Sequence, residues 1–151
     1  LTIFIIFIAS CSSVQVTEES VRESSIATVE VSTDDSYSTS NLAMSVSATV
    51  YFDFDKFNLT SRSIQALRGV VSTMSENTEL TIVIEGHADD RGTREYNLAL
   101  GQRRAESVAD YLESNGINRT RLSIISYGEE NPVDASSNEA AWSKNRRVEI
   151  K

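Results

Sequence analysis

The sequence predicts an α+β fold over residues 47–151, a two-layer sandwich in which helices cover one face of a mixed four-stranded sheet. Short runs rich in β-branched and aromatic residues alternate with longer segments whose apolar side chains recur at helical spacing. Glycine or proline follows several of these segments, where an element is expected to end. These observations predict the order β-α-β-α-β-(α)-β, in which the third helix is short.

The first strand is expected over residues 48–54, because ATVYFDF has the β-branched and aromatic bias of a strand. A loop follows, and Thr60 or Ser61 can cap a helix that runs to about Ser75. One face of this helix should pack in the core. That face consists of Ile64, Leu67, Val71 and Met74.

The second strand is expected over residues 80–85, a nearly continuous apolar run that predicts burial on both faces. The second helix should begin at its cap, Thr93, and run to about Asn115, because Gly116 follows where helices often end in a left-handed residue. Glu95 lies in the first turn, where the helix dipole favours an acid. An apolar stripe on this helix should face the core, formed by Leu100, Val108 and Leu112.

The remaining elements are shorter. A third strand is expected over residues 121–127 and should end at Gly128. Residues 138–144 are expected to form a short helix, and residues 146–151 a last strand. Two side chains of this strand should point inward, those of Val148 and Ile150.

Composition restricts the class of protein. The chain has 151 residues, a formal net charge of −8 and one cysteine. The acidic balance argues against nucleic acid as a partner, because nucleic acids select basic surfaces. A single cysteine, Cys11, excludes an internal disulfide and a multi-cysteine metal site. Residues 1–10 are apolar but too few to span a bilayer, and we interpret them as the remnant of a lipoprotein signal peptide.

The residues after this remnant predict an anchor and a tether. Residues 8–11, IASC, resemble the bacterial lipobox, in which the cysteine becomes the lipidated N-terminus; a buried structural cysteine is the alternative. Ser12 stands where a lipoprotein retained at the inner membrane commonly carries aspartate, which favours the outer membrane. Residues 11–46 are therefore expected to be lipidated Cys11 and a disordered tether, rich in Ser, Thr and Glu.

The candidate site lies between the second strand and the second helix, in a turn crowded with charge that includes Asp89. Arg104 falls on the apolar stripe of the helix, where a guanidinium is costly unless an anion meets it. We therefore hypothesise that Asp89 and Arg104 hold the two ends of a small zwitterion. The alternatives are that Asp89 caps the turn and that Arg104 pairs with Glu85 or Asp110.

The same turn offers two other kinds of chemistry. His87, Asp89 and Asp90 are competent metal ligands, but a lone histidine in a turn is more often a scaffold residue, so no metal or other cofactor is expected. The rival class of protein is a hydrolase that uses Glu85 and Asp89 as acid and base. No nucleophile motif or metal-ligand spacing in the sequence supports it, so the chain is not expected to be an enzyme.

Six short motifs carry a family resemblance. They are Val50–Lys56 (VYFDFDK), Glu85–Thr93 (EGHADDRGT), Tyr96-Asn97, Arg103–Ala105 (RRA), Ser126–Gly128 (SYG) and Asn145–Val148 (NRRV). Together they resemble the OmpA-like peptidoglycan-binding domain over residues 48–151, and within that family the peptidoglycan-associated lipoproteins (Pal). Ala88 departs from the threonine that most OmpA-like domains carry there, although Pal proteins often share the alanine.

The resemblance implies a non-enzymatic module that binds the meso-diaminopimelate of the peptidoglycan stem peptide through Asp89 and Arg104. It implies that Phe54 and Asp55 line the pocket. The residues that lie beside the ligand in the family correspond to Arg91, Gly92, Thr93 and Asn97. It also implies a periplasmic domain anchored to the outer membrane, with TolB of the Tol-Pal system as a partner. A stator-type or porin-type wall anchor is the alternative within this fold.

Four conspicuous side chains are expected to support the site. Arg146 and Arg147 should brace the sheet edge and the pocket wall, and they must face opposite sides because they are neighbours in a strand. Tyr96 and Trp142 are interpreted as packing residues, with ligand platforms as the alternative.

Overall fold

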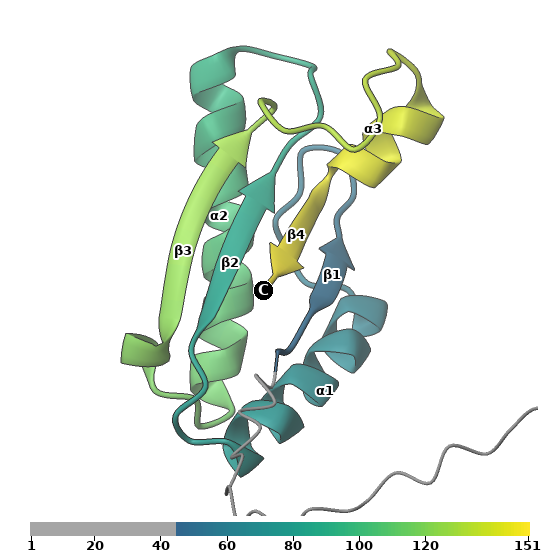
Figure 1. Ribbon diagram of the computed structural model, residues 1–151. Helices are drawn as coiled ribbons and strands as arrows, with labels where there is room; N and C mark the ends of the chain where they lie inside the picture. Colours follow the sequence, from purple (N-terminus) through teal and green to yellow (C-terminus); the bar gives the residue numbers. More distant parts are fainter. Residues whose placement is uncertain (1–44) are drawn as a thin grey trace, which may run out of the picture. The chain divides into compact units, whose positions relative to one another are not determined.

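The computed structural model describes residues 45–151, which form a four-stranded sheet, two long helices against one face of it and a short third helix (Figure 1). Within these residues no helix is both long and apolar enough to cross a membrane. The expected signal remnant at residues 1–10, the lipidated Cys11 and all but the end of the expected tether lie outside the described residues.

The elements follow the predicted order, with a 3-10 turn added before the third strand. They are β1 (Ala48–Tyr51), α1 (Ser61–Glu76), β2 (Ile82–His87), α2 (Arg94–Ser114), η1 (Arg119–Arg121), β3 (Leu122–Gly128), α3 (Glu139–Asn145) and β4 (Arg147–Ile150). Thr60 caps α1 and Thr93 caps α2, as predicted: each side chain accepts a hydrogen bond from a backbone N–H of the first turn.

The sheet order is β1-β4-β2-β3, so the last strand in the sequence lies between β1 and β2. β4 is antiparallel to both neighbours and β3 is parallel to β2, which confirms the predicted mixed sheet. A parallel pair needs a crossover connection, and α2 provides it between β2 and β3. This topology brings the end of β2 and the start of β4 to one end of the sheet (Figure 1).

The core lies between the sheet and the inner faces of α1 and α2. Val148 and Ile150 point into it, as predicted, and each is at most 1% exposed. α2 approaches β2 so closely that a Cβ added at Gly86 would lie 1.9 Å from the carbonyl oxygen of Gly101. Only a residue without a side chain permits this contact, and it places the next turn of α2, with Arg104, beside the end of β2.

The predicted end of the first strand at residue 54 is wrong. β1 ends at Tyr51, because the chain turns at the next residues: the N–H of Lys56 donates to the Asp53 carbonyl (3.2 Å) and Asp55 has a φ of 56°. This turn carries Phe54 and Asp55 away from the sheet and toward the start of α2.

The predicted burial of the second strand on both faces is also wrong. Ile82 and Ile84 face the helices and are buried, whereas Val83 and Glu85 are only half-buried. These two residues alternate with the core residues and point to the side of the sheet away from α1 and α2. An apolar run in the sequence therefore did not distinguish a strand that is buried on both faces from a strand that is buried on one face.

Candidate functional site

A cavity of about 230 Å³ opens where the loop after β1, the turn after β2 and the first turns of α2 meet. Its walls include every residue that the sequence placed at the binding site except Thr93, which caps α2 instead. The lining residues are Phe54, Asp55, Asp89, Arg91, Gly92, Tyr96, Asn97, Leu100 and Arg104. Asp89 and Arg104, which the sequence pairs as the two ends of a ligand, thus border the same cavity.

Backbone carbonyl groups hold Arg104 in one wall of this cavity. The side chain is 0% exposed. Its guanidinium donates hydrogen bonds to the carbonyls of Lys56 (Nε, 2.8 Å), His87 (Nη1, 2.8 Å) and Asp53 (Nη2, 3.2 Å). These bonds join the loop after β1, the end of β2 and the middle of α2, so the elements of the cavity are fixed to one another through Arg104.

Two N–H groups of Arg104 make no hydrogen bond to another residue of the described range 45–151. A guanidinium has five N–H groups and three of them are used here, which leaves one on each terminal nitrogen. Burial lowers the pKa of Arg104 to about 10, and the attraction of Asp89 opposes this, so the side chain is charged at neutral pH. The alternative partners, Glu85 and Asp110, are wrong: Glu85 bonds to Lys151 and Asp110 to Arg119.

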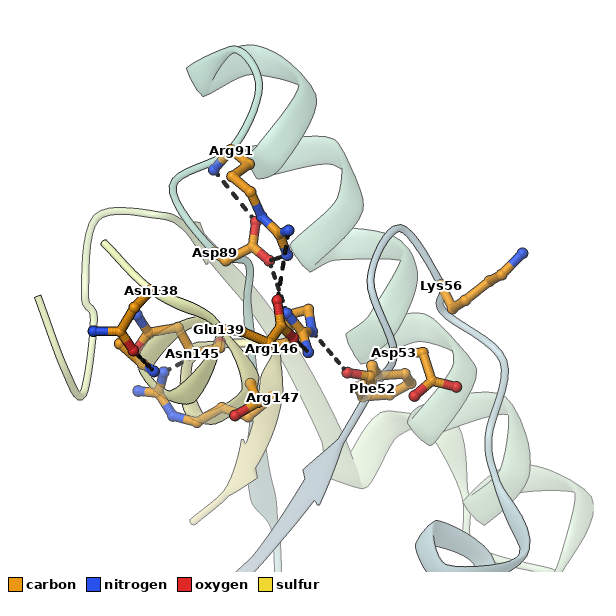
Figure 2. Close-up of polar contacts among 12 residues, drawn as sticks. Phe52, Asp53, Lys56, Asp89, Arg91, Asn138, Glu139, Asn145, Arg146 and Arg147 are labelled. Carbon is orange, nitrogen blue, oxygen red and sulfur yellow. Dashed lines mark hydrogen bonds and ion pairs between the residues drawn. The ribbon is translucent and has the colours of Figure 1, made fainter. Parts of the chain in front are cut away.

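Asp89 forms the anionic end of the site and is 4% exposed. Its Oδ2 accepts hydrogen bonds from Arg91 (Nη2, 2.6 Å) and Arg146 (Nη1, 3.2 Å), and Figure 2 shows the carboxylate between the two guanidinium groups. Burial alone would raise the pKa of Asp89, but the hydrogen bonds from Arg91 and Arg146 outweigh it and lower the pKa. The alternative that Asp89 caps its turn is also correct in part, because Oδ1 accepts from the N–H of Arg91 (3.3 Å).

Arg91 lies between two aromatic rings. Its guanidinium carbon is 4.0 Å from the ring centre of Phe54 and 4.2 Å from that of Trp142, and Nη1 is 3.6 Å from Glu139. The side chain is 31% exposed, in contrast to the nearly buried carboxylate of Asp89. Arg91 therefore holds Asp89 from the solvent side, and two cation–π contacts support it.

Tyr96 closes the loop after β1 against α2. Its hydroxyl donates to the carboxylate of Asp55, and its side chain is 44% exposed at the cavity. The interpretation of Tyr96 as a packing residue, with a ligand platform as its alternative, stays a prediction. Asn97, one residue further along α2, is 1% exposed and donates to Glu129. This hydrogen bond orients the side-chain amide of Asn97 at the cavity.

Arg146 is the site residue whose role was least evident from the sequence. It is 6% exposed, and besides Asp89 it donates to the Phe52 carbonyl (3.1 Å) and to Glu139 (2.6 Å). It braces the pocket wall, as predicted, and its neighbour Arg147 points to the other side, where it bonds to Glu149. The NRRV motif signalled the arginine, but no local signal connects it to Asp89.

The His87 ring does not take part in the cavity. It is 2% exposed and stacks on Tyr127, with ring centres 5.5 Å apart. Burial, together with repulsion by Arg147, lowers its pKa to about 4. Only its backbone carbonyl reaches the site, through Arg104. Among residues 45–151 no three histidine, cysteine or acidic side chains gather closely enough to hold a metal ion.

The acid–base pair required by the hydrolase interpretation is not assembled. Glu85 lies on the open face of the sheet, where it bonds to Lys151 (2.6 Å), and it does not line the cavity that contains Asp89. What the cavity does bring together are two carboxylates, those of Asp55 and Asp89, and two guanidinium groups, those of Arg91 and Arg104. This arrangement fits a ligand that carries both an ammonium and a carboxylate.

Comparison with known proteins gives one consistent group. The model of the OmpA family matches residues 51–146. The chain is 46% identical over 100 residues to the peptidoglycan-associated lipoprotein of Pasteurella multocida, covering 66% of this chain and 67% of that protein. Over 109 residues it is 42% identical to the peptidoglycan-associated lipoprotein of Pseudomonas aeruginosa, covering 72% and 64%. The chain thus spans about two thirds of the length of the curated relatives it matches.

A solved structure agrees with this grouping. The crystal structure of the peptidoglycan-associated lipoprotein from Burkholderia pseudomallei is similar to this chain with a TM-score of 0.66 at 38% identity. The similarity covers 68% of this chain and 86% of that one. The predicted resemblance is therefore confirmed in both sequence and fold.

Proposed function

This chain belongs to the OmpA family, and we propose that it is a lipoprotein of the cell envelope that binds peptidoglycan without covalent chemistry. Relatives named peptidoglycan-associated lipoprotein, at 42% and 46% identity, support the proposal. In this proposal the chain is a binding protein and not an enzyme.

The ligand we propose is the meso-diaminopimelate of the stem peptide. The observation that carries this choice is the cavity of about 230 Å³ that Asp89 and Arg104 both line. The far carbon of diaminopimelate bears an ammonium and a carboxylate: the first would pair with Asp89, the second with the two remaining N–H groups of Arg104. Phe54, Asp55 and Asn97 would surround the same ligand, and Gly92, with a φ of 115°, permits the turn that brings Asp89 beside α2.

The anchor and the protein partner complete the proposal. The lipobox at residues 8–11 supports attachment of Cys11 to the outer membrane, with the domain in the periplasm. Two or more acyl chains on that cysteine would give stable anchoring. We further propose that TolB of the Tol system is a partner, on the basis of the resemblance to Pal proteins alone.

The test is a calorimetric titration with two stem tripeptides that differ only at the third residue, diaminopimelate or lysine. The lysine side chain ends without the far carboxylate, so it cannot use the free donors of Arg104, and we expect it to bind at least tenfold more weakly. Asp89→Asn should weaken binding of the diaminopimelate peptide by about 2–5 kcal/mol, because the ligand ammonium loses its charged partner.

Asp90→Asn is the matched control, since Asp90 is the exposed neighbour of Asp89 and does not line the cavity. It should bind as the wild type does. Equal affinity for the two tripeptides, or normal binding by Asp89→Asn, would overturn the proposed ligand.

A further inference from the structure

A second cavity, of about 510 Å³, runs along the outer edge of β1. Residues of β1 and the two residues that follow it line one side, and residues at the start of α1 line a second. Ser143 and Arg146 line the end next to α3. Because β1 is the first strand in the sheet order, its outer edge pairs with no other strand of residues 45–151.

The outer edge of β1 offers backbone hydrogen-bonding groups. In an antiparallel pair, successive residues alternate between bonding to the partner strand and pointing away from it. The N–H of Phe52 bonds to the Arg146 carbonyl (2.9 Å), so by alternation the backbone groups of Thr49 and Tyr51 point outward. The Tyr51 carbonyl accepts from the Ser63 hydroxyl (3.3 Å). Within residues 45–151, the N–H and C=O of Thr49 and the N–H of Tyr51 have no hydrogen-bond partner, a pattern that an added peptide can use.

Arg62 supplies a cation at the same cavity. Its side chain is exposed, lines the cavity and makes no ion pair with any residue of the described range 45–151. The first turn of α1 contains no acidic residue. Two other charged side chains line the cavity: Asp53, which is exposed, and Arg146, whose guanidinium is already bonded to two carboxylates and a carbonyl. An anion in this cavity would therefore meet Arg62.

The second cavity adjoins the candidate site. Arg146 lines the β1 cavity, and its Nη1 lies 3.2 Å from Asp89, which lines the candidate site. Along the loop after β1, Asp53 lines the first cavity and the next residue, Phe54, lines the other. A peptide held at the candidate site thus has the β1 cavity as a direct neighbour.

We propose that the β1 cavity is a second subsite, which binds the residue of the stem peptide that precedes diaminopimelate. The two amide carbonyls that flank this residue accept hydrogen bonds from the N–H groups of Thr49 and Tyr51, and Arg62 pairs with the free carboxylate of that residue. In stem peptides this residue is a glutamate joined through its side-chain carboxyl, so its α-carboxylate is available unless it is amidated. The inference rests on the proposed function. It adds the chemistry by which the protein would distinguish peptidoglycan whose glutamate carries a free α-carboxylate from peptidoglycan in which that group is amidated.

The test uses two synthetic tripeptides, alanyl-γ-glutamyl-diaminopimelate with a free α-carboxylate and the same peptide with that group amidated. Calorimetry measures both against the full chain and against two variants, Arg62→Gln and Arg68→Gln. Arg68 is an exposed arginine of α1 that does not line the cavity, so it is the matched control. The acidic peptide should bind wild type and Arg68→Gln between about twofold and fivefold more tightly than the amidated one, and Arg62→Gln should bind the two equally.

Amide hydrogen exchange provides an independent readout of the strand pairing. The N–H groups of Thr49 and Tyr51 should exchange more slowly when either tripeptide is bound, and free diaminopimelate should leave their exchange unchanged. If both tripeptides bind but Arg62→Gln retains the difference, or the two amides exchange at an unchanged rate, the subsite is rejected while the proposed function stands. If no diaminopimelate ligand binds at all, the proposed function fails and the subsite with it.

Discussion

The two ends of the candidate cavity are both buried, but they are held by different kinds of group. Arg104 is bonded to three backbone carbonyls, whose positions the sheet and the loop after β1 determine. Asp89 is bonded mainly to the side chains of Arg91 and Arg146. A backbone carbonyl moves only together with the strand or loop that contains it. The side chain of Arg91, which is 31% exposed, can instead move away from Asp89 without unfolding the chain.

Because of this difference, we expect Arg104 to stabilise the fold around the cavity and Asp89 to contact the ligand. The Arg104 end is required for the elements of the cavity to stay together, so it is in place before any ligand arrives. The Asp89 end presents a carboxylate that already holds a cation, and a ligand ammonium would have to compete with Arg91 for it. We therefore expect changes at Arg104 to act first on stability, and changes around Asp89 to act first on binding.

Arg104→Ala should have the largest effect on the fold. The substitution leaves three carbonyls without their donor, among them the buried carbonyl of His87, and removes a fully buried side chain, which should cost about 3–5 kcal/mol in the free energy of unfolding. Urea denaturation followed by circular dichroism measures this loss. Arg103→Ala, at the exposed neighbour in α2, is the control and should change stability by less than about 0.5 kcal/mol.

If Arg104→Ala proved as stable as Arg103→Ala, the carbonyls would have found other donors or water. The two ends of the cavity would then not differ in the kind of group that holds them.

Acid should lower the free energy of unfolding through His87 and through Asp89 in different pH ranges. The decrease that arises from His87 should reach about 3 kcal/mol. Burial lowers the pKa of His87, whose carbonyl holds Arg104, to about 4 from an ordinary value of 6.5. The unfolded chain then binds the proton more readily, so stability falls as the pH drops from 6.5 to about 4. The pKa of Asp89 is lowered below 3.8, so the stability it contributes is lost only at still lower pH.

His87→Phe tests this order, because phenylalanine keeps a ring against Tyr127 but cannot bind a proton. The free energy of unfolding, measured by urea denaturation at a series of pH values, should fall between pH 6.5 and 4 in the wild type. It should stay nearly constant over this range in the variant. A parallel decline in both proteins would assign the acid sensitivity to other groups.

The fold was largely predictable because its signals are local. α2 illustrates this: Thr93 supplies the cap, and Gly116, with a φ of 93°, follows the helix where the sequence placed its end. The position of β4 between β1 and β2 was not predictable, because a strand of four residues contains no information on which partners it will pair with. Strand pairing is decided by contacts across the whole chain.

The same distinction applies to the site. Asp89 and Arg104 could be predicted, since each stands out within its own segment: a carboxylate in a charged turn and a guanidinium on an apolar stripe. The contacts of Arg146 with Asp89 and of Trp142 with Arg91 could not be predicted, because they form only after β4 is inserted into the sheet and α3 is placed at its end. The residues that orient a functional side chain are therefore harder to predict than that side chain itself.

The smallest expected effect concerns the aromatic support of Arg91. Trp142→Leu keeps an apolar side chain but removes one of the two rings on the guanidinium, whose carbon lies 4.2 Å from the ring centre. A double-mutant cycle with Arg91→Gln, measured by thermal unfolding, should give a coupling energy of about 0.5–1 kcal/mol between the two residues. Because Arg91 is also held by Asp89 and Glu139, losing the ring alone should not release it. A coupling of zero would mean that the tryptophan only packs, and that Asp89, Glu139 and the ring of Phe54 hold the guanidinium without it.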